Sequence, residues 1–212
     1  MITLHRLSLL AGIVGSLLLA SCASTTQTLY HDASLSDWTL FTDPASNARP
    51  SSVFKAQGAT IAVTGKPFGY MRTNKQYDDY VLTLEWRWTN GKGTNSGIFQ
   101  RVQPGDRLWP VGIECQLQAG HAGDLLGLSG AYIAGTDSRL KFPKKPRTAT
   151  TDPERPAGQW NKVEIRCVGT HITVKINGQQ VNEAETKLTR GYIALQSEGG
   201  PLEFRNIQIK QL

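Results

Sequence analysis

Residues 113–118 place three polar side chains on one face of a predicted strand. Because side chains alternate along a strand, Glu114, Gln116 and Gln118 project to one side, and three apolar side chains project to the other. A carboxylate and two amides in a row can hydrogen-bond to sugar hydroxyl groups, whereas burying them without partners would be costly. The row therefore indicates either a ligand-binding surface for a polar molecule or a solvated outer face.

Glu114 is the one member of this row that can ionise, since amide side chains do not exchange protons. Ordinary glycosidases need two carboxyl groups, about 5–5.5 Å apart in retaining enzymes and farther apart in inverting ones. Simple hydrolysis of a glycan would therefore require a second acid from a neighbouring strand, such as Glu85 or Glu198.

Short runs of alternating polarity, separated by glycine and proline, predict an all-β chain that forms a two-sheet antiparallel sandwich. No internal repeat suggests a propeller. The expected strands are residues 80–89, 96–103, 111–118, 130–133, 161–168, 171–176, 179–181, 191–197 and 202–211. Gly169-Thr170 and Asn177-Gly178 are predicted hairpin turns. At most one turn of helix is expected, around residues 32–38 or 183–188.

Several residues have an expected place in this sandwich. Trp86 and Trp88 share the parity of core leucines and are predicted to be core residues. Cys115 and Cys167 also have core parity, and they form either a disulfide or two buried thiols. Residues 135–159 contain four prolines and are expected to form a long surface loop beside a site.

Charge and metal-ligand spacing exclude some partners. The chain has 23 basic and 17 acidic residues. Its basic cluster, Lys141, Lys144, Lys145 and Arg147, lies among prolines and is interpreted as a solvated loop, so nucleic acid is not an expected partner. No cofactor is expected, because no Cys and His spacing resembles a zinc site. No loop has the acidic pattern that would identify ligands for a structural calcium ion.

The N-terminus predicts export. In residues 1–21, Arg6 precedes an apolar run that is shorter than the roughly 20 residues of a spanning helix. Leu19-Ala20-Ser21-Cys22 resembles the lipobox of bacterial lipoproteins, with an ordinary signal peptide as the alternative. The resemblance implies lipidation of Cys22 and membrane contact through the lipid anchor alone. Ala23 favours the outer membrane, with the protein facing the periplasm or the cell surface. Residues 22–28 are then a polar tether and residues 29–212 a single domain.

Eight short segments in order carry a resemblance to a known family. They are LEWR at 84–87, NSGIF at 95–99 with Arg101, ECQ at 114–116, SGAY at 129–132, GQWN at 158–161, ING at 176–178, GYIALQ at 191–196 and FRNI at 204–207. From residue 37 to the C-terminus the chain is similar to the 3-keto-disaccharide hydrolase domain. The resemblance implies a concanavalin A-like lectin and glucanase jelly roll, with a carbohydrate site on its concave sheet.

The resemblance also implies a reaction. A carbonyl at carbon 3 of a sugar acidifies the proton on carbon 2, loss of that proton can expel the anomeric substituent, and water can then add to the enone. Family members usually carry an acid where this chain has Gln118, and often a histidine where it has Ser197 and Glu198. Because of these differences, two alternatives stay open: a noncatalytic carbohydrate-binding lipoprotein and a structural lipoprotein.

This elimination needs a base and an oxyanion stabiliser. Glu114 or His121 is the expected base, and Arg101 is the expected stabiliser. The residues expected to contact substrate are Glu85, Asn95, Gln116, Gln118, Tyr132, Trp109, Gln196 and Glu198.

Structural interpretations of some of these residues remain open. Arg101 could instead form an ion pair with Glu85 or Glu114. Trp109 could close the sandwich edge, and His121 could be an exposed loop residue. Trp160-Asn161 is interpreted as the anchor of a strand start, and Arg205-Asn206 as a side-chain-to-backbone tie to a neighbouring strand.

Overall fold

Two antiparallel sheets form the structure, a computed structural model that describes residues 25–31 and 33–212. One sheet consists of β1 (Thr26–Thr28), β3 (Phe54–Gln57), β4 (Thr60–Val63), β6 (Tyr80–Trp88), β11 (Asn161–Val168), β12 (His171–Ile176), β13 (Gln179–Glu185) and β15 (Leu202–Gln211). The other consists of β2 (Trp38–Thr42), β5 (Gly69–Thr73), β7 (Gly97–Val102), β8 (Gly112–Gln116), β9 (Leu125–Leu128), β10 (Lys144–Lys145) and β14 (Tyr192–Ser197).

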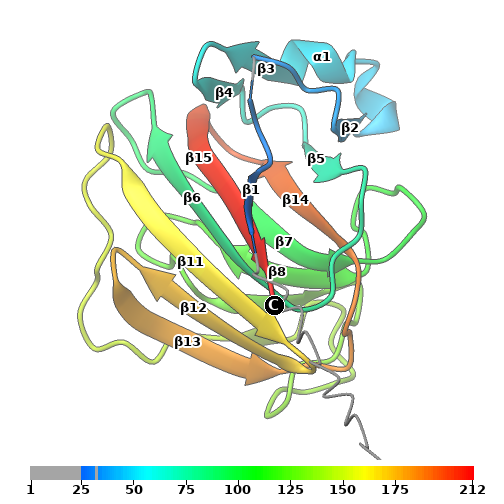
Figure 1. Ribbon diagram of the computed structural model, residues 1–212, viewed down its shortest axis with the longest axis vertical. Helices are drawn as coiled ribbons and strands as arrows, with labels where there is room; N and C mark the ends of the chain where they lie inside the picture. Colours follow the sequence, from blue (N-terminus) through cyan, green and yellow to red (C-terminus); the bar gives the residue numbers. More distant parts are fainter. Residues whose placement is uncertain (1–24, 32) are drawn as a thin grey trace, which may run out of the picture.

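The two sheets pack as a sandwich (Figure 1). The strand order is β13-β12-β11-β6-β15-β4-β3 in the eight-stranded sheet, where β1 also pairs with β15, and β10-β9-β8-β7-β14-β5-β2 in the seven-stranded sheet. The all-β sandwich predicted from the alternating sequence is therefore confirmed. In the described residues the only helical pieces are a 3₁₀ turn at Pro44–Ser46 and α1 at Pro50–Val53, so the helical turns expected at 33–38 and 183–188 are wrong.

The core lies between the sheets and follows the alternation of the strands. Along β6 every second residue is buried, and Trp86 and Trp88 are 0% and 1% exposed, which confirms their prediction as core residues. Cys115 and Cys167 face the same core as free buried thiols, so the disulfide alternative is not realised. Burial of these large apolar side chains is the main stabilising contribution to the sandwich.

The C-terminal half contains the expected hairpins. Gly169-Thr170 joins β11 to β12, and Asn177-Gly178 joins β12 to β13. Asn177 and Gly178 both have positive φ, at 49° and 88°, as a tight turn of this kind requires.

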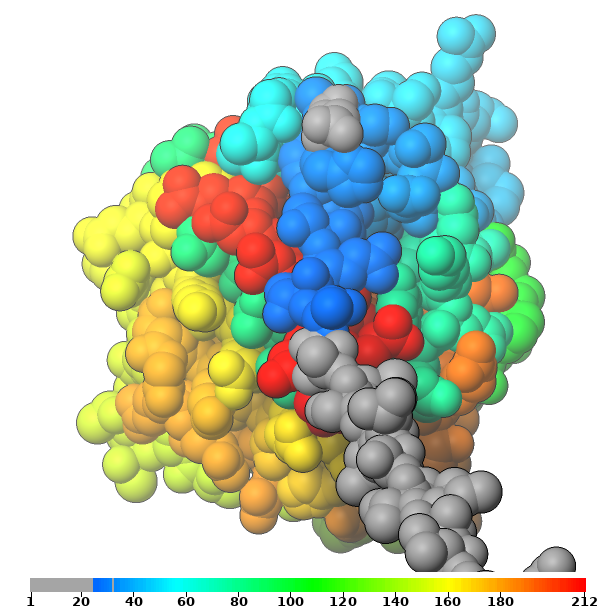
Figure 2. All heavy atoms as spheres, viewed as in Figure 1, coloured from blue at the N-terminus to red at the C-terminus, as the bar shows by residue number. Residues whose placement is uncertain are grey.

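The N-terminal part differs from expectation. Residues 26–28, predicted to belong to the tether, form β1 and pair with Gln208–Lys210 of β15. Figure 2 shows this blue segment beside the red C-terminal strand. Strand β4 reaches only as far as Arg205 along β15, so β1 pairs with backbone groups that β4 leaves open. Cys22 lies outside the described residues. Within the described part of the chain, no helix has the length and apolar character needed to cross a membrane.

Two segments near the site also differ from the secondary structure expected from the sequence. Residues 130–133 form no strand, and the neighbour of β8 is β9 instead. Lys144 and Lys145, interpreted as part of a solvated loop, form β10 against β9. Both strands are too short to show a clear alternating pattern, and each exists because the neighbouring strand offers backbone partners.

Candidate active site

A cavity of about 200 Å³ lies on the outer face of the seven-stranded sheet. Its lining is half polar and half apolar, and consists of Asn95, Trp109, Glu114, Gln116, Leu126, Leu128, Phe142 and Glu198. The parity predicted for β8 is confirmed, because Glu114 and Gln116 face this cavity while Ile113 and Cys115 face the core. Only 2% of Glu114 is exposed, so its face is an enclosed pocket rather than a solvated surface.

The Glu114 side chain lies across Gly97 of the adjacent strand. A Cβ atom at Gly97 would overlap Glu114 Oε1, so the carboxyl can occupy this position only beside a residue without a side chain. Glu114 Oε1 has no hydrogen-bond partner within the described chain. A buried carboxylate oxygen without a partner is costly, which disfavours the ionised form of Glu114.

Glu198 supplies the second carboxyl of the pocket. It follows β14, and its backbone pairs with that of Asn95. Gln196 Nε2 donates to Glu198 Oε2 at 2.9 Å, and the Asn95 side chain is a second hydrogen-bond partner. Because these contacts use the amide nitrogens, Gln196 Oε1 and Asn95 Oδ1 remain buried without partners in the described structure.

The two carboxyl groups have different protonation preferences. Burial, and then the negative charge of Glu198, raise the pKa of Glu114 to about 8, while the positive charge of Lys144 opposes the increase. Burial also raises the pKa of Glu198, but the hydrogen bonds from Gln196 and Asn95 favour its ionised form. At neutral pH Glu114 is therefore the carboxyl that holds a proton.

The opposite wall of the pocket is aromatic. The Trp109 ring lies 4.2 Å from the Phe68 ring and 5.3 Å from the Phe142 ring, measured between centroids. Ser129 Oγ donates to the Trp109 carbonyl at 2.6 Å. Trp109 therefore both packs at the sheet edge and borders the cavity, where its ring could contact the apolar face of a sugar.

The Trp109 loop, residues 103–111, is tied to the sheet by an ion pair. Arg72 Nε and Nη2 donate to the two carboxylate oxygens of Asp106, at 2.7 and 3.0 Å. The Tyr70 hydroxyl lies 3.2 Å from Asp106 Oδ1. This two-point contact holds the loop over the pocket.

Five of the residues predicted from the sequence thus line one cavity, namely Asn95, Trp109, Glu114, Gln116 and Glu198. Gln196 is not part of the lining, but its side chain donates a hydrogen bond to Glu198. Gln118 lies beyond the end of β8 and is exposed. The strand stops at Gln116 because Gln116 Oε1 accepts the backbone N–H groups of the next two residues, at 3.0 Å each.

Arg101 does not reach this pocket, and the expectation of an oxyanion stabiliser there is corrected. The pairing of β7 with β14 shifts register here, and Arg101 has a φ of 55°. Such a bulge redirects a side chain. Arg101 is fully buried and donates to the Leu188 carbonyl. Burial raises the pKa of Cys167 in the core to about 11, and the Arg101 charge opposes part of that increase. In the described structure it forms no ion pair with Glu85 or Glu114, which the sequence also left open.

Glu85 and Tyr132 lie elsewhere on the molecule. Glu85 belongs to β6 of the other sheet, where its Oε2 accepts from Arg205 at 2.5 Å and from Asn206 at 3.2 Å. Arg205 and Asn206 therefore tie β15 to a side chain, not to the backbone groups that were expected. Tyr132 packs under Lys187, with 4.7 Å between Nζ and the ring centroid.

Trp160 and Asn161 take part in contacts at the start of β11. Asn161 is buried, and its Oδ1 accepts from the Arg155 backbone at 2.7 Å and from Asn177 Nδ2 at 2.8 Å. The Trp160 ring lies under the guanidinium groups of Arg87 and Arg205, at 4.6 and 3.9 Å. Both contacts agree with their interpretation as anchors of the strand start.

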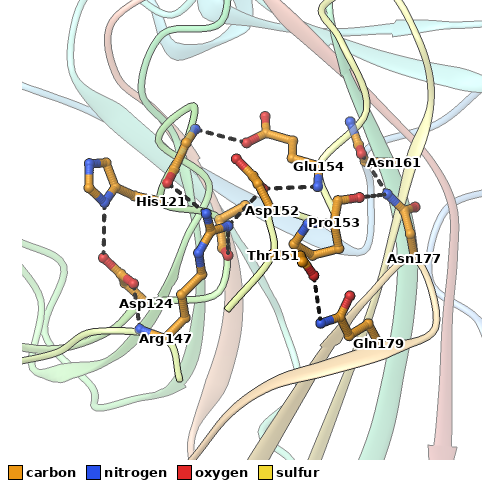
Figure 3. A network of polar contacts seen from close by, with 12 residues as sticks. His121, Asp124, Arg147, Thr151, Asp152, Pro153, Glu154, Asn161, Asn177 and Gln179 are labelled. Carbon is orange, nitrogen blue, oxygen red and sulfur yellow. Dashed lines mark hydrogen bonds and ion pairs between the residues drawn. The ribbon is translucent and has the colours of Figure 1, made fainter. Parts of the chain in front are cut away.

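His121 lies in the loop after β8, outside the pocket lining. Its side chain is 54% exposed, and its Nδ1 is 3.5 Å from Asp124 Oδ2. Arg147 lies in the loop after β10 and contacts the His121 loop through the Gly120 carbonyl at 3.0 Å (Figure 3). Within its own loop, Arg147 also contacts Asp152 at 2.8 Å. This placement matches the interpretation of His121 as an exposed loop residue.

The sequence reading missed Lys144 and Asp124. Lys144 Nζ is 2.8 Å from Asp124 Oδ2, and this carboxylate is only 2% exposed. The sequence shows a positive charge at Lys144 but not where that charge lies, because the position of Lys144 depends on pairing between distant segments.

The described residues contain no cluster of three or more His, Cys, Asp or Glu side chains that could hold a metal ion.

Solved structures share this fold. A proposed glycosyl hydrolase from Parabacteroides distasonis ATCC 8503 matches with a TM-score of 0.65 and 20% identity, covering 89% of this chain and 100% of that one. Carbohydrate binding module CBM66 from Bacillus subtilis matches at 0.59 and 11%, covering 82% and 96%. LamAcat from Zobellia galactanivorans matches at 0.55 and 12%, covering 82% and 90%. At these identities the likeness establishes the jelly-roll fold alone.

The sequence itself matches a family model. The 3-keto-alpha-glucoside-1,2-lyase-like domain matches residues 25–210, which is nearly all of the described chain. A search among proteins of curated function finds no match to this sequence.

Proposed function

The chain belongs to the family of 3-keto-alpha-glucoside-1,2-lyase-like domains, and from that premise we propose that it cleaves 3-keto-glycosides by elimination. Water then adds to the enone, so that the net reaction is hydrolysis. The reaction takes place in the pocket on the outer face of the seven-stranded sheet. One observation carries the proposal: two carboxyl groups share that pocket, and burial raises the pKa of one of them, Glu114, to about 8.

The elimination needs a base for the proton on carbon 2 and an acid for the leaving oxygen on carbon 1. We assign Glu198 the role of base, because the hydrogen bonds from Gln196 and Asn95 offset part of the burial effect that raises its pKa. Glu114 holds a proton at neutral pH and donates it to the leaving group as the bond to carbon 1 breaks. This assignment differs from the sequence-based expectation, in which Glu114 or His121 was the base.

The pocket walls suit this substrate class. The polar side chains of Asn95, Gln116 and Glu198 in the lining can exchange hydrogen bonds with sugar hydroxyl groups. Trp109 and Phe142 offer an apolar surface to a sugar ring or an aglycone. The same features could retain a sugar without chemistry, so a noncatalytic carbohydrate-binding domain is the alternative function.

Purified protein incubated with 3-keto-α-glucosides and with unmodified disaccharides tests the proposal. Cleavage of the keto substrates alone is expected, with losses of at least 10²-fold in Glu114→Gln and Glu198→Gln. Glu164→Gln, an ion-pair residue on the other sheet, is the matched control and should keep wild-type activity. A chelator arm tests for metal dependence.

The outcomes separate the alternatives. Saturable sugar binding without products would favour the binding domain. Equal cleavage of keto and unmodified substrates would instead identify an ordinary glycosidase and contradict the elimination.

We also propose that the protein is attached to the outer membrane through a lipid on Cys22. Support for this proposal comes from the lipobox-like sequence and the apolar run before it.

A further inference from the structure

Three residues on neighbouring strands lie in register across the edge of the pocket. Lys144 of β10 pairs with Leu126 of β9, and Leu126 pairs with Glu114 of β8. Directly opposed residues on antiparallel strands project to the same face. Since Leu126 and Glu114 both line the cavity, the Lys144 side chain projects on the cavity side of the sheet.

One ion pair positions the Lys144 ammonium and leaves part of its hydrogen-bonding capacity available. Its Nζ lies 2.8 Å from Asp124 Oδ2, and 39% of the Lys144 side chain is exposed. Asp124 also accepts the Arg147 backbone N–H at 2.7 Å and lies 3.5 Å from His121 Nδ1. Within the described residues Asp124 is the only partner of the Lys144 ammonium, which has three N–H donors. The ammonium therefore keeps donors for a ligand on this face of the sheet.

The positive charge of Lys144 affects the pKa of Glu114 in the pocket. Among the groups that shift the pKa of Glu114, Lys144 is the one that lowers it, against burial and the Glu198 carboxylate. A cation beside a partly buried site attracts any negative charge that forms there.

The proposed elimination creates such a charge. When Glu198 takes the proton from carbon 2, the electron pair of that bond moves into the carbon 2–carbon 3 bond, and the carbonyl oxygen on carbon 3 becomes an enolate oxygen. The carbonyl then re-forms, a double bond forms between carbons 1 and 2, and the bond to the leaving oxygen breaks as Glu114 protonates that oxygen. Arg101, expected to stabilise the enolate, is buried in the core.

We propose that Lys144 is the catalytic residue that stabilises the enolate, by donating a hydrogen bond from its ammonium to the oxygen on carbon 3. This inference rests on the proposed function. Asp124 is then a positioning residue that holds the ammonium at the strand edge.

Exchange of the carbon 2 proton tests this role separately from cleavage. The wild type and Lys144→Met are mixed with a 3-keto-α-glucoside in deuterated water, and deuterium incorporation and product release are followed by mass spectrometry. Lys144→Met is expected to lower both rates by about 10²–10³-fold with little change in KM, as for loss of one oxyanion donor. Lys144→Arg should recover part of the loss.

Two further measurements exclude a merely structural effect. Lys145→Met, an equal charge change on the adjacent residue with opposite parity, should stay within about twofold of the wild type. Loss of the Lys144 charge should also move the alkaline limb of the pH profile upward, because that charge lowers the pKa of Glu114. If Lys144→Met does not fold, Lys144→Gln replaces it.

Wild-type exchange and cleavage in Lys144→Met would overturn the role of Lys144 and leave the proposed function intact. A wild-type protein that neither exchanges the proton nor cleaves a keto-glycoside would overturn both proposals.

Discussion

Glu114 and Glu198 are chemically alike, and their surroundings give them different roles. Glu114 is buried beside Gly97 without a hydrogen-bond donor for Oε1, whereas Glu198 is partly exposed and receives hydrogen bonds from two amides. Desolvation raises the pKa of both carboxyl groups, and at Glu198 the two hydrogen bonds offset part of that effect. The pair therefore resembles an acid and a base that are ready at the same pH.

The pH dependence of kcat/KM should report this assignment. Activity on a 3-keto-glycoside is expected to rise as Glu198 ionises and to fall near pH 8, as Glu114 loses the proton it must donate. Steady-state rates between pH 5 and 10 measure both limbs, and Glu164→Gln should show the same profile. A rate that instead rises through pH 8 would show that Glu114 is the base.

Gly97→Ala tests how closely the sheet fits Glu114. The added methyl would overlap Glu114 Oε1 and force the carboxyl to move, so a loss in kcat/KM on the order of 10²-fold is expected. Gly112→Ala is the matched control, since its methyl would meet its nearest neighbours at 3.2 Å. Thermal unfolding of both variants shows whether they fold. Full activity in a folded Gly97→Ala variant would argue against this position of Glu114.

At the scale of elements, the site combines one strand, one strand end and one loop. Strand β8 supplies Glu114, the end of β14 supplies Glu198, and the loop of residues 103–111 carries Trp109 over them. The loop has no ladder of its own, so the Arg72–Asp106 ion pair fixes its position. A rigid sheet thus holds the charges, and a tethered loop forms the apolar wall.

Arg72→Met should make the Trp109 loop more mobile. Without the bidentate contact to Asp106, the Trp109 loop is expected to sample positions that bind sugar less well. We expect KM to rise several-fold while kcat stays within about twofold, because the carboxyl groups do not move. Arg190→Met, which breaks the exposed pair with Asp78, serves as the control. A lower kcat with unchanged KM would place the effect of Arg72 on the chemistry instead.

At the scale of the whole molecule, the buried Glu114 makes stability depend on pH. Its pKa is raised from 4.5 in the unfolded chain to about 8 in the folded protein. Between these values the folded state binds more protons, so the free energy of unfolding falls as the pH rises. The contribution of Glu114 to the free energy of unfolding is fully present below about pH 4.5 and is lost above about pH 8.

Chemical denaturation at pH 5 and pH 8 measures this effect. Glu114→Gln cannot ionise, so its stability relative to the wild type should increase by about 3.5 kcal/mol between the two pH values. Glu198→Gln is a useful companion, because removing that negative charge should lower the pKa of Glu114 and reduce the wild-type dependence. Parallel pH curves for the wild type and Glu114→Gln would contradict a raised pKa.

The proposed lipid anchor belongs to the same scale. Cells that express the full chain and are labelled with a radioactive fatty acid should incorporate label into the protein and hold it in the membrane fraction. Cys22→Ser should lose both properties, while Cys115→Ser should keep them because Cys115 is a buried core thiol. Membrane retention of unlabelled Cys22→Ser would point to attachment by another route.

Local patterns in the sequence determined the class of fold and part of the site. Alternation assigned Glu114 and Gln116 to one face of β8, put Trp86 in the core, and located the Asn177-Gly178 turn. These features depend on the neighbours of each residue along the chain, so a single sequence shows them.

Only the tertiary structure decided which groups meet. Glu198 and Lys144 reach Glu114 through strand pairing between distant segments, and a shift in register at β14 turns Arg101 into the core. The short strands β9 and β10 likewise exist because of their neighbours. Register between separate strands depends on packing across the whole sandwich, and no local pattern in the chain encodes it.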